Sequence, residues 1–182
     1  MDTKDVVRIA LFAALTAALA LFPPITIPAI GVPVTAQTLG VMLAGGILGG
    51  RRGALAILLF LVLVAAGLPL LSGGRGGFAV FAGPSGGFLV GWIAGAFVVG
   101  FLTERFWARL DIIRAGIACV VGGIVVVYAF GIPWLAVVAE MSLWGAAAAV
   151  GVFVPGDVIK AALAVAVILT VKRAYPLIAS PT

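Results

Sequence analysis

Residues 51–105 read RRGALAILLFLVLVAAGLPLLSGGRGGFAVFAGPSGGFLVGWIAGAFVVGFLTER and set two long apolar runs around a glycine-rich link. The runs, at about 53–71 and 87–103, have the length and composition of helices that cross a membrane. Glycines in the link permit unusual backbone angles, and the link carries one charge, Arg75. The stretch therefore predicts two membrane-spanning helices joined by an irregular loop.

The rest of the chain has the same apolar character. Of its 182 residues, 64% are hydrophobic and 9% are charged, with a mean hydropathy of +1.35, whereas about half of a soluble domain is apolar. Further apolar runs lie at about 6–22, 36–50, 115–132 and 156–171. We expect an all-α integral membrane protein, a six-transmembrane-helix bundle with one domain over 1–182. The apolar stretch 134–150 is interrupted by Glu140 and predicts a short helix lying across one face, with a seventh span as the alternative.

The basic residues are distributed unevenly between the two sides of the membrane when six spans cross it in alternating directions. One side receives Lys4, Arg8, Arg51, Arg52, Arg105, Arg109, Arg114, Lys172 and Arg173, and the other side receives Arg75 and Lys160. By the positive-inside rule the crowded side is cytoplasmic, so both termini are predicted to be cytoplasmic. Three long irregular segments, 23–36, 72–87 and 133–156, then lie on the extracellular side. Because irregular backbone at membrane depth is tolerated where it lines a cavity, these loops are predicted to roof a pocket.

Asp157 and Lys160 form the strongest candidate site. They are three residues apart in VPGDVIK and share one face of the last predicted helix. Twelve residues separate Lys160 from Lys172, a rise of roughly 18 Å, which is well short of a hydrocarbon core of ~30 Å. The pair is therefore predicted to lie below the outer surface, where ionisable groups are costly unless they are paired or face a cavity. A helix cap explains Asp157 but not Lys160, since a cation opposes the helix dipole there; a purely structural ion pair is the alternative.

Several classes of function lack the residues they need. The chain has no histidine, one cysteine (Cys119) and no phosphate-binding G-x-x-x-x-G-K-[ST] string, so neither a metal site, a catalytic site nor ATP hydrolysis is expected. The basic residues behind the net charge of +5 lie mainly at the ends of the predicted membrane spans, so we expect no nucleic-acid partner. An intramembrane enzyme that uses Lys160 with Asp157 or with Ser85 is one alternative. A scaffold that assembles membrane subunits and binds no ligand is another.

Three motifs together resemble the BioY family, the biotin-binding S-components of energy-coupling-factor (ECF) vitamin transporters. They are PVTAQTLGVMLAGGILGGRRGALA at 33–56, GGRGGFAVFAGPSGGFLVGW at 73–92, and VPGDVIKAALA at 154–164. The resemblance covers nearly the whole chain and implies a prokaryotic, multi-pass protein of the cytoplasmic membrane. Its extracellular-side loops would enclose biotin as the transported ligand, without a cofactor. An S-component for a different small carboxylate vitamin remains an alternative.

The resemblance also implies residues and partners. Asp157 and Lys160 match the acidic and basic residues that the family uses in biotin recognition, and we add Arg75, Ser85, Gly77 and Gly86 as candidate biotin contacts. Ser85 stands where threonine is more usual and keeps the hydroxyl. The implied partners are a transmembrane coupling subunit (EcfT- or BioN-like) and ATPase subunits (EcfA- or BioM-like), with a homo-oligomer also open. Ala10, Ala14 and Ala18 recur every four residues on the first helix and are the candidate docking face for the coupling subunit, with packing inside the bundle as the alternative.

Overall fold

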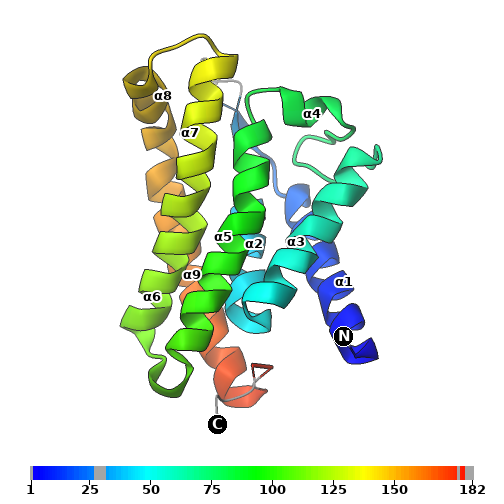
Figure 1. Cartoon of the computed structure of the whole chain (residues 1–182), viewed down its shortest axis with the longest axis vertical. Helices are drawn as coiled ribbons and strands as arrows, with labels where there is room; N and C mark the ends of the chain where they lie inside the picture. The colour runs from blue at the N-terminus through cyan, green and yellow to red at the C-terminus, as the bar shows by residue number, and fades with distance from the viewer. Residues whose placement is uncertain (1, 27–31, 176, 179–182) are drawn as a thin grey trace.

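The computed structural model describes residues 2–26, 32–175 and 177–178, and most of this chain is helical. The longer helices are α1 (Thr3–Ala18), α2 (Gln37–Leu48), α3 (Gly50–Ala65), α5 (Gly86–Arg105), α6 (Ile112–Val120), α7 (Val127–Val138) and α9 (Val154–Ala174). They run side by side in one bundle, and the start of α1 and the end of α9 lie at the same end of it (Figure 1). The all-α prediction is confirmed.

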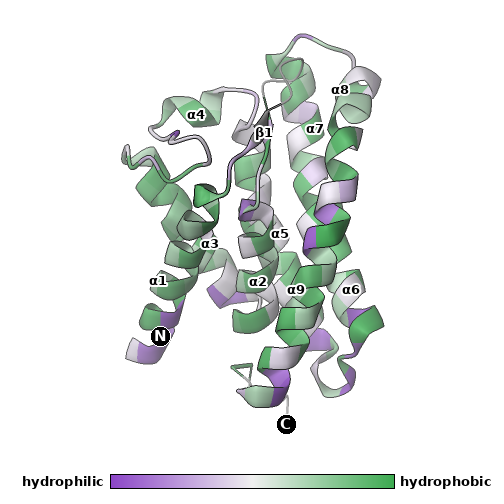
Figure 2. Ribbon diagram, turned by 180° about the vertical axis from the view of Figure 1, so that it is seen from behind, coloured by the Kyte–Doolittle hydropathy of each residue, from purple (hydrophilic) through white to green (hydrophobic). Residues whose placement is uncertain are grey.

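Short elements gather at the opposite end of the bundle (Figures 1 and 2). Two-residue strands β1 (Ile25–Thr26) and β2 (Pro33–Val34) pair in antiparallel register, and the short helices α4 (Ala79–Ala82) and α8 (Leu143–Val150) lie at the same level. The described parts of the three segments predicted to be irregular therefore lie at one end, but for 133–156 the prediction is wrong, because that segment is mostly helical. Within the first of them, residues 27–31 lie outside the described residues.

Within the residues that the structure describes, three helices are long and apolar enough to cross a membrane. They are Gly86–Arg105, Ile112–Val138, which joins α6 to α7 through a π-helical turn at Val121–Val126, and Leu143–Ala174, which joins α8 to α9. By contrast, α2 has 12 residues, about 18 Å, where the sequence predicted a span over 36–50. Ten of its residues are buried, so α2 lies inside the bundle and is surrounded by longer helices.

Two predicted spans end earlier than expected. The span at 53–71 stops at Ala65, because Gly67 adopts a left-handed φ of 106° and Pro69 lacks the amide donor that would continue a helix. The span at 6–22 stops at Ala18 and tightens into a 3₁₀ turn, Leu19–Leu21. Apolar composition alone does not mark these ends, because the loops that follow are also apolar.

The prediction of a short helix across one face at 134–150 is wrong. Residues 134–138 instead complete α7, which continues through Pro133, as membrane helices tolerate when neighbours satisfy the freed carbonyl. The chain turns at Glu140, the one non-glycine residue of the described chain with a left-handed φ, at 51°. Residues 143–150 then form α8, which leads through a 3₁₀ turn directly into α9.

Helix α5 is the centre of the bundle and packs against α2, α3 and α7. Glycines allow this packing to bring backbones together. A Cβ added at Gly45 of α2 would overlap the carbonyl oxygen of Ala96 in α5, and a Cβ added at Gly100 of α5 would overlap the backbone of Gly49 and Gly50. The α2–α3 corner is therefore seated directly on the backbone of α5.

Candidate functional site

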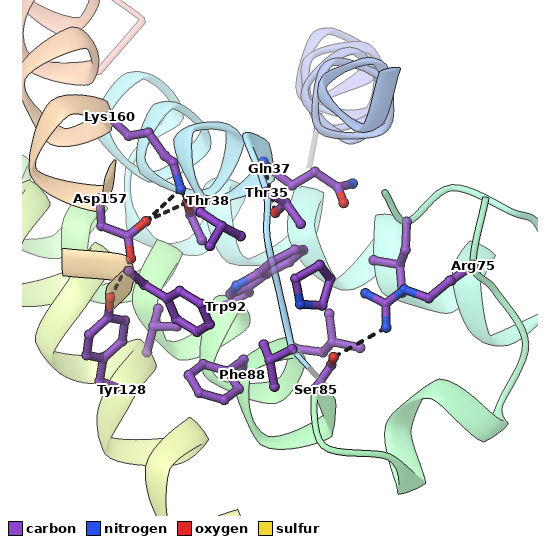
Figure 3. A pocket seen from close by; sticks show the side chains of 17 residues that line it. Thr35, Gln37, Thr38, Arg75, Ser85, Phe88, Trp92, Tyr128, Asp157 and Lys160 are labelled. Atoms are coloured by element: carbon purple, nitrogen blue, oxygen red, sulfur yellow. Dashed lines mark hydrogen bonds and ion pairs between the residues drawn. The ribbon is translucent and has the colours of Figure 1, made fainter. Parts of the chain in front are cut away.

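A cavity lies beneath the loops at the end of the bundle opposite to the termini. Its wall is formed by segment 32–35, by the loop at 67–77 that carries Arg75 (the Arg75 loop), and by helices α2, α5, α7 and α9. Its lining includes the polar and aromatic residues Thr35, Gln37, Thr38, Arg75, Ser85, Phe88, Trp92, Tyr128, Phe153, Asp157 and Lys160, and Figure 3 labels all of these except Phe153. These residues come from segments far apart in the sequence, so the cavity exists only in the folded chain.

One end of the cavity holds the ion pair of α9. Lys160 Nζ donates to Asp157 Oδ1 at 2.7 Å and to Thr38 Oγ1 at 2.9 Å. Thr38 Oγ1 in turn donates to Asp157 Oδ1 at 3.2 Å, and the Tyr128 hydroxyl donates to Asp157 Oδ2 at 2.6 Å. Asp157 is 4% exposed, so both of its oxygens are held by neighbours with little access to water. Buried charges require this kind of satisfaction, and a network so complete fixes the carboxylate in one orientation.

The sequence around Asp157 explains how α9 presents the pair. Pro155 occupies the start of the helix, where its missing amide donor costs nothing, and Asp157 lies in the first turn. Three residues further on, Lys160 emerges on the same face. The pair has apolar residues on both sides along the chain and points toward Thr38 and Tyr128 inside the bundle (Figure 3).

Arg75 holds the opposite end of the cavity. Its loop is closed by two backbone hydrogen bonds between Leu71 and Arg75, of 3.0 and 3.2 Å, around Gly73 and Gly74, which have left-handed φ values of 79° and 69°. The guanidinium group donates to the Ser85 hydroxyl and to the Ser72 carbonyl, each at 3.4 Å, which is long for a hydrogen bond.

No carboxylate of the described chain lies within salt-bridge distance of Arg75. Burial lowers the pKa of the guanidinium from its ordinary value, but arginine stays protonated at physiological pH. The half-buried cation is therefore free to bind an external anion through its planar fork.

Apolar side chains separate the two charged ends. Phe88 and Trp92 of α5 lie between Asp157 and Arg75 (Figure 3). Phe88 packs edge-on against Tyr128 with ring centroids 6.3 Å apart, and Phe60 supports Trp92 from behind at 6.3 Å. The cavity thus has a polar end, an apolar middle and a cationic end, which suits a ligand with the same order of groups.

Four of the predicted contact residues line this cavity: Asp157, Lys160, Arg75 and Ser85. Gly77 and Gly86 are not among the lining residues. Gly77 has a left-handed φ of 85° and donates its amide to the Val64 carbonyl, so it anchors the loop on α3. Gly86 is buried against Phe81 and Trp134 at the start of α5. Both glycines shape the loop without facing the cavity.

The structure also contradicts one pairing considered for an enzyme. Ser85 bonds Arg75 at the cationic end, whereas Lys160 bonds Asp157 and Thr38 at the other end (Figure 3). A Ser85–Lys160 dyad is therefore not formed, because α5 and α9 present these residues to opposite ends of the cavity.

Thr38, Tyr128 and Gln37 were not predicted from the sequence as site residues. Each is a polar residue in or at the start of an apolar run, a signal that marks functional candidates in membranes. A second signal is the π-helical turn Val121–Val126, which ends just before Tyr128; such turns are frequent at functional sites.

The fold and the cavity define a membrane-embedded helical protein with an internal cavity whose lining suits a small organic anion with further polar groups. Comparisons with known proteins then identify the family. A family model described as the BioY family matches residues 1–177. A protein of Rhizobium etli named biotin transporter BioY is 53% identical, with 98% of each chain covered. Another of that name, from Rhodobacter capsulatus, is 46% identical, with 95% of each chain covered.

A solved structure has the same fold. It is described as the S-component for biotin from an ECF-type ABC transporter, and it matches with a TM-score of 0.90 at 33% identity over 95% of each chain. The chain belongs to the BioY family, as the three motifs suggested. It is a multi-pass protein of the prokaryotic cytoplasmic membrane, and the relatives are named as transporters rather than enzymes.

Proposed function

We propose that this protein captures biotin and takes part in its uptake as the substrate-specific subunit of an ECF-type transporter. The observation that carries the proposal is the cavity with an Asp157–Lys160 pair at one end and, at the other, an arginine that has no carboxylate partner among the described residues. The names of the relatives support it. In this role the protein needs no cofactor of its own.

The groups of biotin match the cavity in order. Its ureido ring offers two N–H donors and a carbonyl acceptor, its thiophane ring is apolar, and its valerate tail ends in a carboxylate. Asp157 accepts a hydrogen bond from a ureido N–H and Lys160 donates to the ureido oxygen, while Phe88 and Trp92 cover the thiophane ring. Arg75 and Ser85 then hold the carboxylate.

Binding requires part of the cavity wall to move outward. The cavity encloses about 50 Å³, whereas small-molecule sites typically enclose ~300–1,000 Å³. Segment 32–35 forms part of the wall and contains only the two-residue strand β2 as regular structure, so it is the part that gives way at the lowest cost.

Replacing Arg75 with glutamine is expected to raise the dissociation constant for biotin ~10–100-fold, because a hydrogen bond to a charged group contributes ~1.5–3 kcal/mol. Biotin methyl ester, which has no negative charge, should bind both forms with similar affinity. Isothermal titration of the purified variants measures both constants. Equal loss of affinity for biotin and its ester would show that Arg75 does not hold the carboxylate.

The proposed topology has six passages with both termini in the cytoplasm. The twelve residues of α2 are too short for a passage, but the four preceding residues, 32–35, add up to ~13 Å in extended form to its ~18 Å. Non-helical backbone is acceptable there because Val32, Pro33, Val34 and Thr35 line the cavity. Hydrophilic residues concentrate at the end that holds the start of α1 and the end of α9, and the positive-inside rule makes that end cytoplasmic (Figure 2).

The coupling subunit is proposed to dock on α1. Ala10, Ala14 and Ala18 are all exposed, while Ala13 between them is buried in the bundle, so the stripe is available to an external helix. The ATPase subunits would act through that coupling subunit.

Replacing Ala14 with tryptophan is expected to reduce uptake of labelled biotin roughly tenfold or more in cells that also express the coupling subunit and the ATPases, because a bulky residue separates closely packed helices. Biotin binding by the purified variant should be unchanged. Ala166→Trp, at an exposed alanine of α9, is the matched control and should leave uptake intact. Equal uptake by the Ala14 variant and the control would remove α1 as the docking face.

Equilibrium binding of radiolabelled biotin to the protein purified alone in detergent tests the proposed function. Excess unlabelled biotin should displace the label, whereas lipoate, a vitamin-like carboxylate without a ureido ring, should not. Displacement by lipoate at similar concentration would favour a different carboxylate vitamin as the ligand. Failure of the wild-type protein to bind biotin would contradict the proposal.

A further inference from the structure

Gln37, the first residue of α2, is fully buried, and its side chain makes four hydrogen bonds. Its Nε2 donates to the carbonyl oxygens of Thr16 and Leu70, both at 3.0 Å. Its Oε1 accepts from the backbone amide of Ser72 at 3.1 Å and from the Ser72 hydroxyl at 3.3 Å. A glutamine amide has two donor hydrogens and one oxygen with two lone pairs, so every hydrogen-bonding position of this side chain is used.

These bonds join three parts of the fold. Thr16 belongs to the last turn of α1, Leu70 and Ser72 belong to the loop that carries Arg75, and Gln37 itself begins α2. The Ser72 carbonyl then accepts a hydrogen bond from Arg75 Nε. A continuous chain of contacts therefore runs from α1 and α2 through Gln37 and Ser72 to the guanidinium group at the cationic end of the cavity.

The loop has few other means of holding its shape. Gly67, Gly73, Gly74 and Gly77 all have left-handed φ values, and a Cβ at Gly67, Gly74 or Gly77 would meet no atom within 4 Å. Such a segment is readily deformed, because glycines restrict the backbone least and neighbouring side chains do not enclose it. Apart from Gln37, the hydrogen bonds that hold the loop within the described chain are those inside it, those from the amides of Gly67, Leu68 and Gly77 to α3, and single long bonds to Val80 and Ser85.

We propose that Gln37 is a positioning residue, which holds the Arg75 loop in the conformation that binds the ligand carboxylate. This inference rests on the proposed function, in which Arg75 receives that carboxylate. Gln37 acts through Ser72 and the loop backbone. Its neighbour Thr38 bonds the Asp157–Lys160 pair, so the first turn of α2 sets the distance between both ends of the cavity.

If Gln37 only stabilised the fold, replacing it would lower stability and would affect biotin and its ester equally. The test must distinguish this role from the positioning of Arg75. Gln37→Met keeps the length of the side chain and removes all four bonds. Thr103→Val is the matched control, because Thr103 is equally buried and its hydroxyl bonds only the Val99 carbonyl of its own helix, away from the cavity. Dissociation constants for biotin and for biotin methyl ester are measured for both variants, with and without Arg75→Gln.

The expected result is a roughly tenfold weaker affinity for biotin in Gln37→Met, with the affinity for the ester unchanged within about twofold. In the Arg75→Gln background the same substitution should have no further effect, since the residue it positions is gone. Equal loss for biotin and the ester, or full additivity with Arg75→Gln, would overturn the inference. If Arg75→Gln itself does not distinguish biotin from the ester, the carboxylate assignment of the proposed function fails instead.

Hydrogen exchange of the ligand-free protein tests the positioning role independently of the ligand. The backbone amides of Ser72 and Arg75, which are hydrogen-bonded in the structure, should exchange at least ~10-fold faster in Gln37→Met than in the wild type or in Thr103→Val. Unchanged exchange at these amides would overturn the inference whatever ligand the cavity binds.

Discussion

Removing the charges of Asp157 and Lys160 together, with Asp157→Asn and Lys160→Met, is expected to weaken biotin binding at least ~100-fold and to leave the protein folded. Each charged hydrogen bond to the ureido ring is worth ~1.5–3 kcal/mol, so losing two costs ~3–6 kcal/mol of binding free energy. Stability should be retained, because replacing a buried ion pair by neutral residues of similar size is often neutral or stabilising. Asparagine at 157 still offers an oxygen to the Tyr128 hydroxyl.

The single substitutions should behave differently. Asp157→Asn alone leaves the ammonium of Lys160 without its countercharge, and Lys160→Met alone leaves the buried carboxylate without its cation. Breaking a buried pair in this way costs ~3–5 kcal/mol, which lowers the midpoint of thermal unfolding by roughly 10 °C. Each single variant should therefore lose both stability and biotin binding, and the double variant only binding. A double variant that binds biotin as the wild type does would show that the pair is structural.

Gly100→Ala is expected to destabilise the fold by ~3 kcal/mol or more. The added methyl group overlaps the backbone of Gly49 and Gly50, and backbone at a helix corner cannot turn aside as a side chain can. Overpacking of a dense core usually costs ~1–3 kcal/mol, and this position is at the upper end because α5 contacts both α2 and α3 there. The measurement is thermal unfolding in detergent, followed by the fluorescence of the tryptophans.

Gly116→Ala provides the matched control. Gly116 lies in α6, where an added Cβ would meet no atom within 4 Å, and alanine is favoured over glycine in a helix by ~1 kcal/mol. This variant should be as stable as the wild type or slightly more so. If both substitutions gave the same midpoint, the close approach of α5 to the α2–α3 corner would be disproved.

The sequence predicted the fold class well and the helix ends poorly, for one physical reason. Apolar runs identify membrane helices because the bilayer requires them, but a loop that lines a buried cavity is apolar as well. Residues 68–71 were therefore predicted to be helical, whereas the helix in the structure ends at Ala65. In the same way, the turn at Glu140 was predicted to be an interruption within a helix. The continuation of α7 through Pro133 depends on which groups of neighbouring segments lie beside it, and the sequence does not reveal them.

The site was predictable where chemistry is exceptional and local. Asp157 and Lys160 stand out because two charges occupy one helix face within an apolar run, and both line the cavity. Thr38 and Tyr128 complete the same network from positions 119 and 29 residues away from Asp157, and no local pattern links them to it. The role of Gln37 follows from four contacts that only the folded chain creates. Gly77 and Gly86 were chosen as ligand contacts from their motif, but the packing of the loop turns them away from the cavity.

A crystal structure of the protein with bound biotin tests the central claim most directly. The orientation of the ligand decides it, because both ends of the cavity carry a cation. We expect the ureido ring within hydrogen-bonding distance of Asp157 and Lys160, with the carboxylate on Arg75. A carboxylate lying against Lys160, or biotin bound elsewhere on the protein, would contradict the assignment of the two ends.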